Sequence, residues 1–465
     1  MNEFRIEKDA MGEVEIPGSA LWGASTQRAI DNFPISGRTL PIAYIQKLAL
    51  IKKIAAETNA RLGILDKKIA CAIFSSASEI IKGNHNDQFP IDVFQTGSGT
   101  STNMNLNEVI ANLANLQLGG KTGLWKPVHP NDHVNMCQSS NDVMPSALHV
   151  AAAVAIKEIL LPAMKSLHKS LLNKSKKFRD IKKIGRTHLM DAVPMTLGQE
   201  FSGWARQIER CISIIKSASN ELCEIALGGT ALGTGLGAHP KFSKRVCKDL
   251  SKITGIEFMP AKNAFEAISW RGPSVAVSGA LKTFATALYR TADDIRLLAS
   301  GPRLGFSEIE LPALQPGSSM MPGKVNPVIP EMACQVANHV IGNDAAITAA
   351  AMSGHLELNT QLPLVAINLL ESIEVLSAAA KTFAKKCIDG IVASENKCRK
   401  NIEMSLAMAT ALVPQIGYAT ASEIAKKAYA EGKSIREITA EMNILSAREL
   451  DAIFDIDSLI NRGQK

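Results

Sequence analysis

Long apolar segments with helical periodicity constrain this chain more than any other feature. The segment "SALHVAAAVAIKEILLPAMKSLHKSLLNKSKKFRD" (146–180) keeps apolar residues at helical spacing over about 35 residues, and Pro162 predicts a kink within it. Similar patterns cover four further stretches, about 195–226, 274–299, 328–351 and 362–390. Five long helices with little strand signal between them predict an all-α helix bundle.

Two of these helices are apolar around most of their circumference. They are "VAVSGALKTFATALYRTADDIRLLA" (275–299) and "AINLLESIEVLSAAAKTFAKKC" (366–387). Helices of this kind are usually buried on all sides, which one bundle of five helices does not achieve. We therefore expect a homo-oligomer.

The pattern differs before and after the long helices. Residues 40–83 predict helices broken near Gly63, and residues 106–117 predict another. After about residue 397 only short helical pieces occur, such as "SIREITAEM" and "SARELDAIF". We expect three domains: an N-terminal helical domain at 1–138, a central helix-bundle domain at 139–396 and a small C-terminal helical domain at 397–465.

Composition limits the class of protein. Hydrophobic residues make up 46%, charged residues 20% and aromatic residues 5% of the chain, which has a formal net charge of +7. Basic residues are scattered among acidic ones without interleaved aromatics, so we expect no nucleic-acid partner. None of the eight cysteines forms a C-x-x-C pair, which is typical of free thiols in a reducing compartment. The start contains acids and no long apolar run, and no membrane span is expected, so a cytoplasmic location is predicted.

Four loops concentrate small hydroxyl and amide residues. They are "TGSGT" (96–100), "HPNDHVNMCQSSND" (129–142), "GRTHLMD" (185–191) and "GSSMMPGKVNP" (317–327), the last followed closely by Glu331. The first lacks the Gly-Lys-Ser/Thr ending and the preceding strand of a nucleotide phosphate loop. Polar loops between apolar helices predict a binding site.

Metal and dinucleotide sites are poorly supported. "GGTALGTGLG" (228–237) falls between helical segments, so a dinucleotide fingerprint is not indicated. His129 and His133 have the spacing of a metal pair, but Pro130 argues against a regular helix and no third ligand follows from the pattern. We predict no metal and no cofactor.

The loop residues suit a carboxylate ligand. Serine, threonine and asparagine offer neutral donors and Lys324 offers one cation, and carboxylates accept several hydrogen bonds at once. His188 and Glu331 are the titratable groups. The residues alone therefore indicate acid–base chemistry on a small polycarboxylate.

The stretch "GSSMMPGKVNP" resembles the G-S-S-x-M-P-x-K-x-N-P signature of the fumarase/aspartase superfamily, and the resemblance covers nearly the whole chain. "FQTGSGTSTNMNLNEV", "HPNDHVN", "QSSND", "IGRTHL" and "LASGPRLG" are most similar to the class II fumarate hydratase branch. "DAVPMTLGQEF" and "NPVIPEMACQV" look like the aspartate ammonia-lyase versions. Ser98 and Ser140 favour the hydratases, because aspartases typically have alanine and threonine there. An ammonia-lyase, or a non-catalytic structural relative, remains the alternative.

The resemblance implies a fold and a reaction. The fold would have a central bundle of five long helices, and four such bundles would form the 20-helix core of a homotetramer. Each active site would combine loops of three subunits. The reaction implied is reversible hydration of fumarate to L-malate, a step of the tricarboxylic acid cycle, through an aci-carboxylate intermediate and without metal or redox cofactor.

The resemblance also assigns residues. Ser318 would be the base, and His188, partnered by Glu331, would orient or protonate the departing water. The residues expected to bind the substrate are Ser98, Thr100, Ser139, Ser140, Asn141, Thr187, Ser319, Lys324 and Asn326. A second anion site is expected at His129, Asn131 and Asp132.

Three positions depart from the family pattern. Lys126-Pro127 stands where an arginine and a lysine usually precede the second anion site. Ala313 and Gln315 stand where fumarases usually carry acidic residues. The stretch "AISWRGPSVAVSG" (267–279) replaces one that usually contains histidine and aspartate, and its Gly272-Pro273 pair predicts an interrupted helix start.

Overall fold

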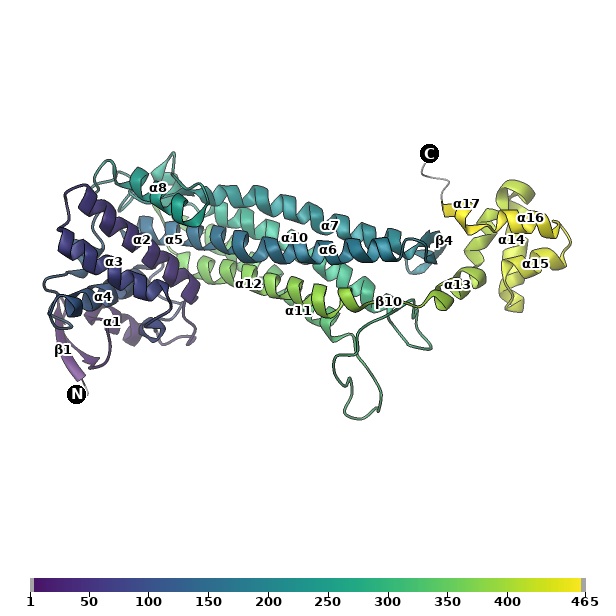
Figure 1. Ribbon diagram of the computed structural model, residues 1–465, viewed down its shortest axis with the longest axis horizontal. Helices are drawn as coiled ribbons and strands as arrows, with labels where there is room; N and C mark the ends of the chain where they lie inside the picture. The colour runs from purple at the N-terminus through teal and green to yellow at the C-terminus, as the bar shows by residue number, and fades with distance from the viewer. Residues whose placement is uncertain (1–3, 461–465) are drawn as a thin grey trace. The chain divides into compact units, whose positions relative to one another are not determined.

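The computed structural model describes residues 4–460 (Figure 1). Its contacts divide the chain into two compact units. Unit 1 contains the residues up to Pro162 together with Ser213–Ala285 and Asn338–Ser377. Unit 2 contains Ala163–Ile212, Thr286–Ala337 and the residues from Ala378 onward. The unit boundaries fall within long helices, so each unit is assembled from segments distant in sequence.

Long helices dominate the chain, and the all-α prediction is confirmed. The long helices labelled in Figure 1 are α6 (Leu161–Lys177), α7 (Leu197–Ser219), α10 (Gly272–Leu298), α11 (Val328–Ala351) and α12 (Leu362–Lys386). α5 (Ser140–Ala155) continues into α6 through a π-helical turn, Ile156–Leu160. That turn immediately precedes Pro162, whose ring has no N–H and crowds the carbonyl four residues earlier. The irregularity predicted at Pro162 is therefore a widened turn just before it.

Polar contacts pair these helices within each unit. In unit 1, Asp344 of α11 accepts hydrogen bonds from Ser278 and Lys282 of α10, at 2.7 and 2.6 Å. In unit 2, the indole N–H of Trp204 on α7 donates to Asp294 of α10 at 3.2 Å. Asn343 of α11 also donates to Ser372 of α12 at 3.1 Å, and buried apolar side chains line the long helices.

Unit 1 also holds the N-terminal helices, α1 (Ala24–Asn32), α2 (Ile42–Arg61), α3 (Lys67–Ile81), α4 (Thr100–Gln117), α8 (Phe242–Thr254) and α9 (Ala264–Ser269). The predicted break near Gly63 lies between α2 and α3, and Gly63 has a φ of +78° that suits glycine. α4 begins six residues before the predicted start at 106. The hydroxyl and amide residues of that first turn hide its helical character from a pattern of apolar spacing.

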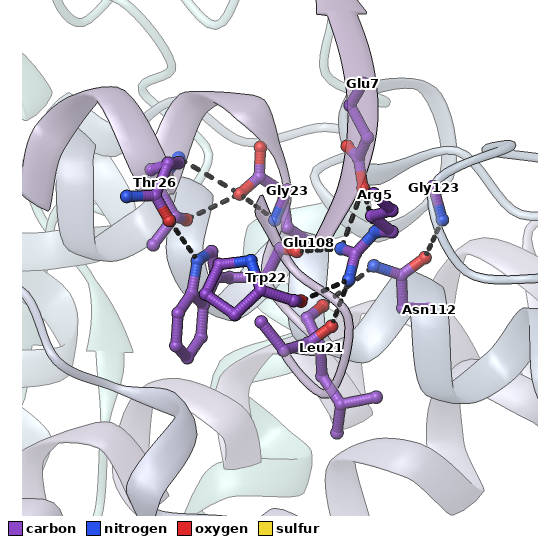
Figure 2. A network of polar contacts seen from close by, with 12 residues as sticks. Arg5, Glu7, Leu21, Trp22, Gly23, Thr26, Glu108, Asn112 and Gly123 are labelled. Carbon is purple, nitrogen blue, oxygen red and sulfur yellow. Dashed lines mark hydrogen bonds and ion pairs between the residues drawn. The ribbon is translucent and has the colours of Figure 1, made fainter. Parts of the chain in front are cut away.

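A buried carboxylate on α4 closes the N-terminus of α1 (Figure 2). Gly23 precedes α1 and has no side chain to cap it. Glu108 accepts hydrogen bonds from the backbone N–H groups of Gly23, Ser25 and Thr26, at 2.9, 3.0 and 3.2 Å. Burial raises the pKa of Glu108, while these donors oppose the shift. α4, which carries Thr100 at its first position, is thereby fixed against the N-terminal segment.

The strands are short and form five two-stranded sheets among the described residues. The two clearest hairpins are β1 (Phe4–Asp9) with β2 (Gly12–Pro17) and β3 (Lys182–Thr187) with β4 (Met190–Thr196). The others pair β5 (Glu224–Ile225) with β6 (Met259–Pro260), β7 (Ile309–Glu310) with β10 (Val392–Ala393), and β8 (Gly354–His355) with β9 (Leu358–Asn359). The sequence pattern did not predict them.

The described residues after β10 form helices within unit 2. They are α13 (Glu395–Met404), α14 (Val413–Glu431), α15 (Ile435–Glu441), α16 (Ala447–Ile453) and α17 (Ile456–Ile460). Ile424, Ile435 and Ile438 are fully buried in their common core. Two helical stretches elsewhere, Ser140–Lys177 and Leu362–Gly390, are long and apolar enough to cross a membrane, and 67% of each apolar window is buried inside the protein. Such burial is typical of core helices.

Candidate active site

The candidate residues fall into two groups, one in each unit. In unit 1 a chain of hydroxyl groups joins three of them. Thr100 Oγ1 lies 2.8 Å from Ser98 Oγ and 2.8 Å from Ser140 Oγ. Ser98 is buried, while Thr100 and Ser140 are partly exposed. The chain orients three hydroxyls at the N-termini of α4 and α5, where backbone N–H groups favour an anion.

Ser139 and Asn141 frame the start of α5. Ser139 caps the helix by accepting a hydrogen bond from the backbone N–H of Asn141 at 3.3 Å, and Asp142 completes a capping box. The Asn141 side-chain amide donates to the carbonyl of Ala231 at 2.7 Å, which fixes its orientation. The structure therefore brings together all five substrate-binding candidates of unit 1.

The buried carboxylate of Asp142 supports the substrate-binding candidates of unit 1. It is fully buried and accepts from the backbone N–H of Ser139 at 2.8 Å, and from those of Gly228 and Thr230 at 2.8 and 2.9 Å. Burial raises the pKa of Asp142 to about 7. The glycine-rich 228–237 stretch thus serves as a backbone partner of the site rather than as a dinucleotide loop. Sequence reasoning missed Asp142, although the S-x-x-D spacing of a capping box could have revealed it.

A second buried charge supports the 129–142 loop. Lys52 of α2 is fully buried, and its ammonium donates to Asn135 Oδ1 at 2.8 Å. The same oxygen accepts from the amides of Asn103 and Asn107, at 3.1 and 3.2 Å. Burial lowers the pKa of Lys52 to about 7. A lysine within an apolar helix carried no signal of this role in the sequence.

The expected second anion site is a compact turn. His129 Nδ1 accepts from the backbone N–H groups of Asn131 and Asp132, both at 3.2 Å. His133 Nδ1 in turn accepts from the backbone N–H of His129 at 2.9 Å. Nδ1 of each histidine is thus an acceptor within the turn. No group of three or more histidine, cysteine, aspartate or glutamate side chains suited to a metal occurs in residues 4–460.

In unit 2, Thr187 and His188 lie at the tip of the β3–β4 hairpin. Thr187 pairs with Met190, so the tip consists of His188 and Leu189. Both have positive φ, 56° and 62°, the left-handed conformation that a two-residue hairpin turn of this kind requires. Glycine, asparagine and aspartate are the usual residues in such a turn, and histidine is also enriched in this conformation. The His188 side chain is exposed.

A buried ion cluster anchors this hairpin. Glu308 is fully buried and accepts from Arg186 at 2.8 Å, with Lys183 at 3.1 Å. Lys183 also binds Glu200 at 2.8 Å. Burial alone would raise the pKa of Glu308, but the Arg186 hydrogen bond and the Lys183 charge hold it below its ordinary value. Both cations belong to β3, so the cluster fixes the strand that ends at Thr187.

The 317–327 loop closes on itself. The backbone N–H of Gly317 donates to the carbonyl of Lys324 at 2.8 Å, and the Asn326 side-chain amide donates to the carbonyl of Gly317 at 2.6 Å. Inside this closure Ser318 Oγ accepts from the backbone N–H groups of Met320 and Met321, at 3.1 and 2.9 Å. Two main-chain donors of the loop are therefore directed at the Ser318 oxygen.

The other unit 2 candidates are positioned but not joined. Lys324 and Ser319 are exposed on the loop, and Glu331 lies in the first turn of α11. Within the described chain no hydrogen bond or ion pair links His188 to Glu331. Ala313 and Gln315 are exposed before the loop and the structure gives them no evident role.

Comparisons with known proteins identify the family. A lyase family model matches residues 12–342, and a model of the fumarase C C-terminus matches residues 408–461. The chain is 49% identical to a class II fumarate hydratase of Nitrosomonas europaea over 98% of both chains. It is 50% identical to one of Mycobacterium tuberculosis over 97% of this chain and 95% of that one. The crystal structure of class II fumarase from Schistosoma mansoni matches with a TM-score of 0.94 and 38% identity, covering 97% of this chain and 98% of that chain. The chain therefore belongs to the class II fumarate hydratases of the fumarase/aspartase superfamily.

Proposed function

We propose that the protein is a lyase that reversibly adds water to fumarate to give L-malate, by acid–base catalysis without a metal or redox cofactor. The observation that carries the mechanism is the pair of backbone N–H groups on Ser318 Oγ, at 3.1 and 2.9 Å. A serine hydroxyl is a very weak acid, and it acts as a base only when donors stabilise its alkoxide. The 317–327 loop supplies such donors.

When malate is the substrate, Ser318 takes the proton from the carbon next to one carboxylate. The electron pair moves onto that carboxylate and forms the aci-carboxylate, whose charge Lys324 and Asn326 would stabilise together with the Ser319 region. The electron pair then returns to form the carbon–carbon double bond as the bond from the neighbouring carbon to its hydroxyl breaks, and the hydroxyl leaves as water after protonation with the help of His188. Thr187 and the unit 1 group of Ser98, Thr100, Ser139, Ser140 and Asn141 would hold the carboxylates.

We further propose a cytoplasmic homotetramer whose active sites combine loops of three subunits. The exposure of Thr187, His188 and Lys324 in the single chain supports this assembly, since groups that bind a dicarboxylate need an enclosed site. Glu331, which has no bond to His188 of its own chain, would pair with the histidine of a neighbour. His129, Asn131 and Asp132 would form a second anion site outside the catalytic centre.

An absorbance assay near 240 nm, with L-malate and L-aspartate offered separately, tests the reaction. We expect fumarate to form from malate and not from aspartate. Fumarate from aspartate alone would assign the protein to the ammonia-lyase alternative. No fumarate from either substrate would favour the structural relative.

The variant Ser318→Ala tests the base. We expect kcat to fall by about two to four orders of magnitude, with native mass and thermal unfolding unchanged, because a general base contributes ~10²–10⁴-fold. Ser78→Ala, on α3 outside the candidate site, is the matched control and should keep the wild-type rate. A rate for Ser318→Ala within about threefold of wild type would remove Ser318 from the role of base.

A further inference from the structure

Asn135 forms hydrogen bonds through each of its backbone and side-chain polar groups. Its backbone N–H donates to the carbonyl of Pro130, and its own carbonyl accepts from the backbone N–H of Gln138, both at 3.0 Å. Its side-chain Nδ2 donates to the carbonyl of Gln138 at 3.1 Å, and its Oδ1 accepts from Lys52 Nζ at 2.8 Å. The two ends of the Asn135 amide are therefore fixed by different parts of unit 1.

The Asn135 oxygen holds the start of α4. It accepts from the side-chain amides of Asn103 and Asn107, at 3.1 and 3.2 Å, and both of these residues are buried. Thr100 is the first residue of α4 and lies about one turn before Asn103. Because a helical turn is rigid, holding Asn103 also holds the turn that carries the Thr100 hydroxyl.

The Asn135 nitrogen holds the start of α5. Its partner Gln138 directly precedes Ser139, the N-cap of that helix, and Ser140 is the first helical residue. Thr100 Oγ1 lies 2.8 Å from Ser140 Oγ, so the two helix starts meet through their hydroxyls. One side chain thus bonds to both segments that bring these hydroxyls together.

Asparagine is suited to this position because its amide is both acceptor and donor in one plane. Aspartate would accept from Lys52 but would have no N–H for the Gln138 carbonyl. The bond from the fully buried Lys52 ammonium, at 2.8 Å, is shorter than the two amide bonds to the same oxygen, as expected when the donor is charged. Lys52 therefore fixes the oxygen about which the other contacts are arranged.

We propose that Asn135 is a positioning residue whose amide, held by Lys52, sets Thr100 on α4 against Ser140 on α5 so that both hydroxyls bind a carboxylate of the substrate. This inference rests on the proposed function for the class of substrate. Asn135 acts through the two helix starts and not through contact with the reacting atoms. Hydroxyls that hold a carboxylate stabilise the bound substrate and the transition state alike, so misplacing them raises KM and leaves kcat nearly unchanged.

The variant Asn135→Leu tests the proposal, because leucine has nearly the shape of asparagine and neither donates nor accepts. We expect the KM for L-malate to rise by about 10- to 100-fold, the value of a hydrogen bond to a charged group, and kcat to stay within about threefold of wild type. Asn84→Leu removes an exposed asparagine bonded to Glu79 and is the matched control, which should keep both constants. A wild-type KM in Asn135→Leu would overturn the proposal.

A second substitution separates positioning from folding. Asn135→Leu leaves the buried Lys52 ammonium without its acceptor, so we expect the midpoint of thermal unfolding to fall. Adding Lys52→Met removes the unpaired charge and should restore most of the midpoint, while KM should stay raised by about 10-fold or more because Thr100 and Ser140 are still not held. Recovery of KM together with the midpoint would show that Asn135 supports the fold only.

A milder variant covers the case in which Asn135→Leu and the double variant fail to assemble. Asn103→Leu keeps the bond from Lys52 to Asn135 and cuts one link to α4, and we expect it to raise KM by about threefold or more. A wild-type KM in Asn103→Leu would then contradict the proposal.

The reaction of wild type is scored first and separately. If wild type uses L-aspartate instead of malate, the same constants are measured with aspartate, and if it uses neither, calorimetric dissociation constants for succinate replace KM. Malate turnover with unchanged substrate binding in the variants refutes this inference alone. Weakened binding in the variants of a protein that does not hydrate fumarate refutes the proposed reaction alone, and a wild type that neither turns over nor binds a dicarboxylate refutes both.

Discussion

Two buried ionisable groups near the candidate site are hydrogen-bonded by neutral groups. Lys52 donates to the Asn135 amide oxygen, and Asp142 accepts from three backbone N–H groups. Charged hydrogen bonds of this kind contribute about 1.5–3 kcal/mol each, and removing one partner leaves the other buried and unpaired. Asp142 belongs to the 129–142 segment and Lys52 contacts that segment through Asn135, so both groups help to hold its shape.

His149 gives the fold a pH dependence at the residue scale. It is buried on α5, and Nδ1 lies 2.9 Å from the carbonyl of Glu224. Burial, reinforced by the Arg271 charge, lowers the pKa of His149 from 6.5 to about 4. Between pH 6.5 and 4 His149 is therefore protonated in the unfolded chain and neutral in the folded chain. The stability due to this histidine is fully present above pH 6.5 and is lost as the pH falls from 6.5 to 4.

Replacing His149 tests this directly. We expect urea unfolding of wild type to lose about 2–3 kcal/mol more between pH 7 and pH 4 than unfolding of His149→Gln, which cannot titrate. His355→Gln removes an exposed histidine and should behave as wild type. An identical pH dependence in wild type and His149→Gln would contradict the assignment.

At the scale of elements, apolar periodicity predicted those features that depend only on the packing of the core. The long helices and the break near Gly63 follow from spacing, because core burial selects apolar residues on a fixed face. The β3–β4 hairpin was expected only as a loop. Its turn contains His188 and Leu189, whereas the usual signal for such a turn is Asn-Gly. The Glu308 ion cluster, which tertiary contacts create and no local pattern reveals, holds the β3 strand that leads into this turn.

The candidate site likewise contains residues that local sequence patterns identify and residues that only the fold identifies. The unit 1 and unit 2 residues were identified through loop composition and motif spacing, which are local. Asp142 and Lys52 act through buried contacts between segments distant in sequence, such as Asp142 with Gly228 and Thr230. A single sequence shows such residues only as charges in apolar surroundings, so their roles depended on the fold.

The closure of the 317–327 loop depends on the absence of a side chain at Gly317. A Cβ on Gly317 would lie 2.7 Å from both the Lys324 carbonyl oxygen and the Asn326 backbone nitrogen. We expect Gly317→Ala to open the closure and displace Ser318, and kcat to fall by about 100-fold or more while thermal unfolding changes little. Reaction geometry tolerates little misplacement, and this loop is mostly exposed. Steady-state kinetics and calorimetry measure the two effects.

A second glycine provides the comparison for Gly317. A Cβ on Gly203 of α7 meets no atom within 4 Å, so Gly203→Ala removes a helix-breaking residue without a clash. We expect Gly203→Ala to keep the wild-type kcat with equal or slightly higher stability. A wild-type kcat in Gly317→Ala would show that the loop's shape does not depend on this close approach.

For the whole molecule, the decisive feature is an uncharged helix face left uncovered in unit 1. α11 exposes Ile341, Gly342, Ala345, Thr348 and Ala349 along one side. Small residues let a second helix approach closely, and an apolar face of this length on a bundle helix is suited to another subunit. The proposed tetramer would cover it, and would also bring the exposed catalytic loops to neighbouring chains.

Substitution on this face links assembly to catalysis. We expect light scattering to give about four times the chain mass of 49.8 kDa for wild type, and a smaller mass for Ile341→Glu, which places an unpaired carboxylate in the proposed interface. Malate turnover should fall with the tetramer fraction, because each site would need residues of several chains. Ile253→Glu, at an exposed isoleucine of α8, should keep both mass and turnover. A monomeric wild type would refute the assembly, and full activity in a dissociated Ile341→Glu would show that one chain builds a complete site.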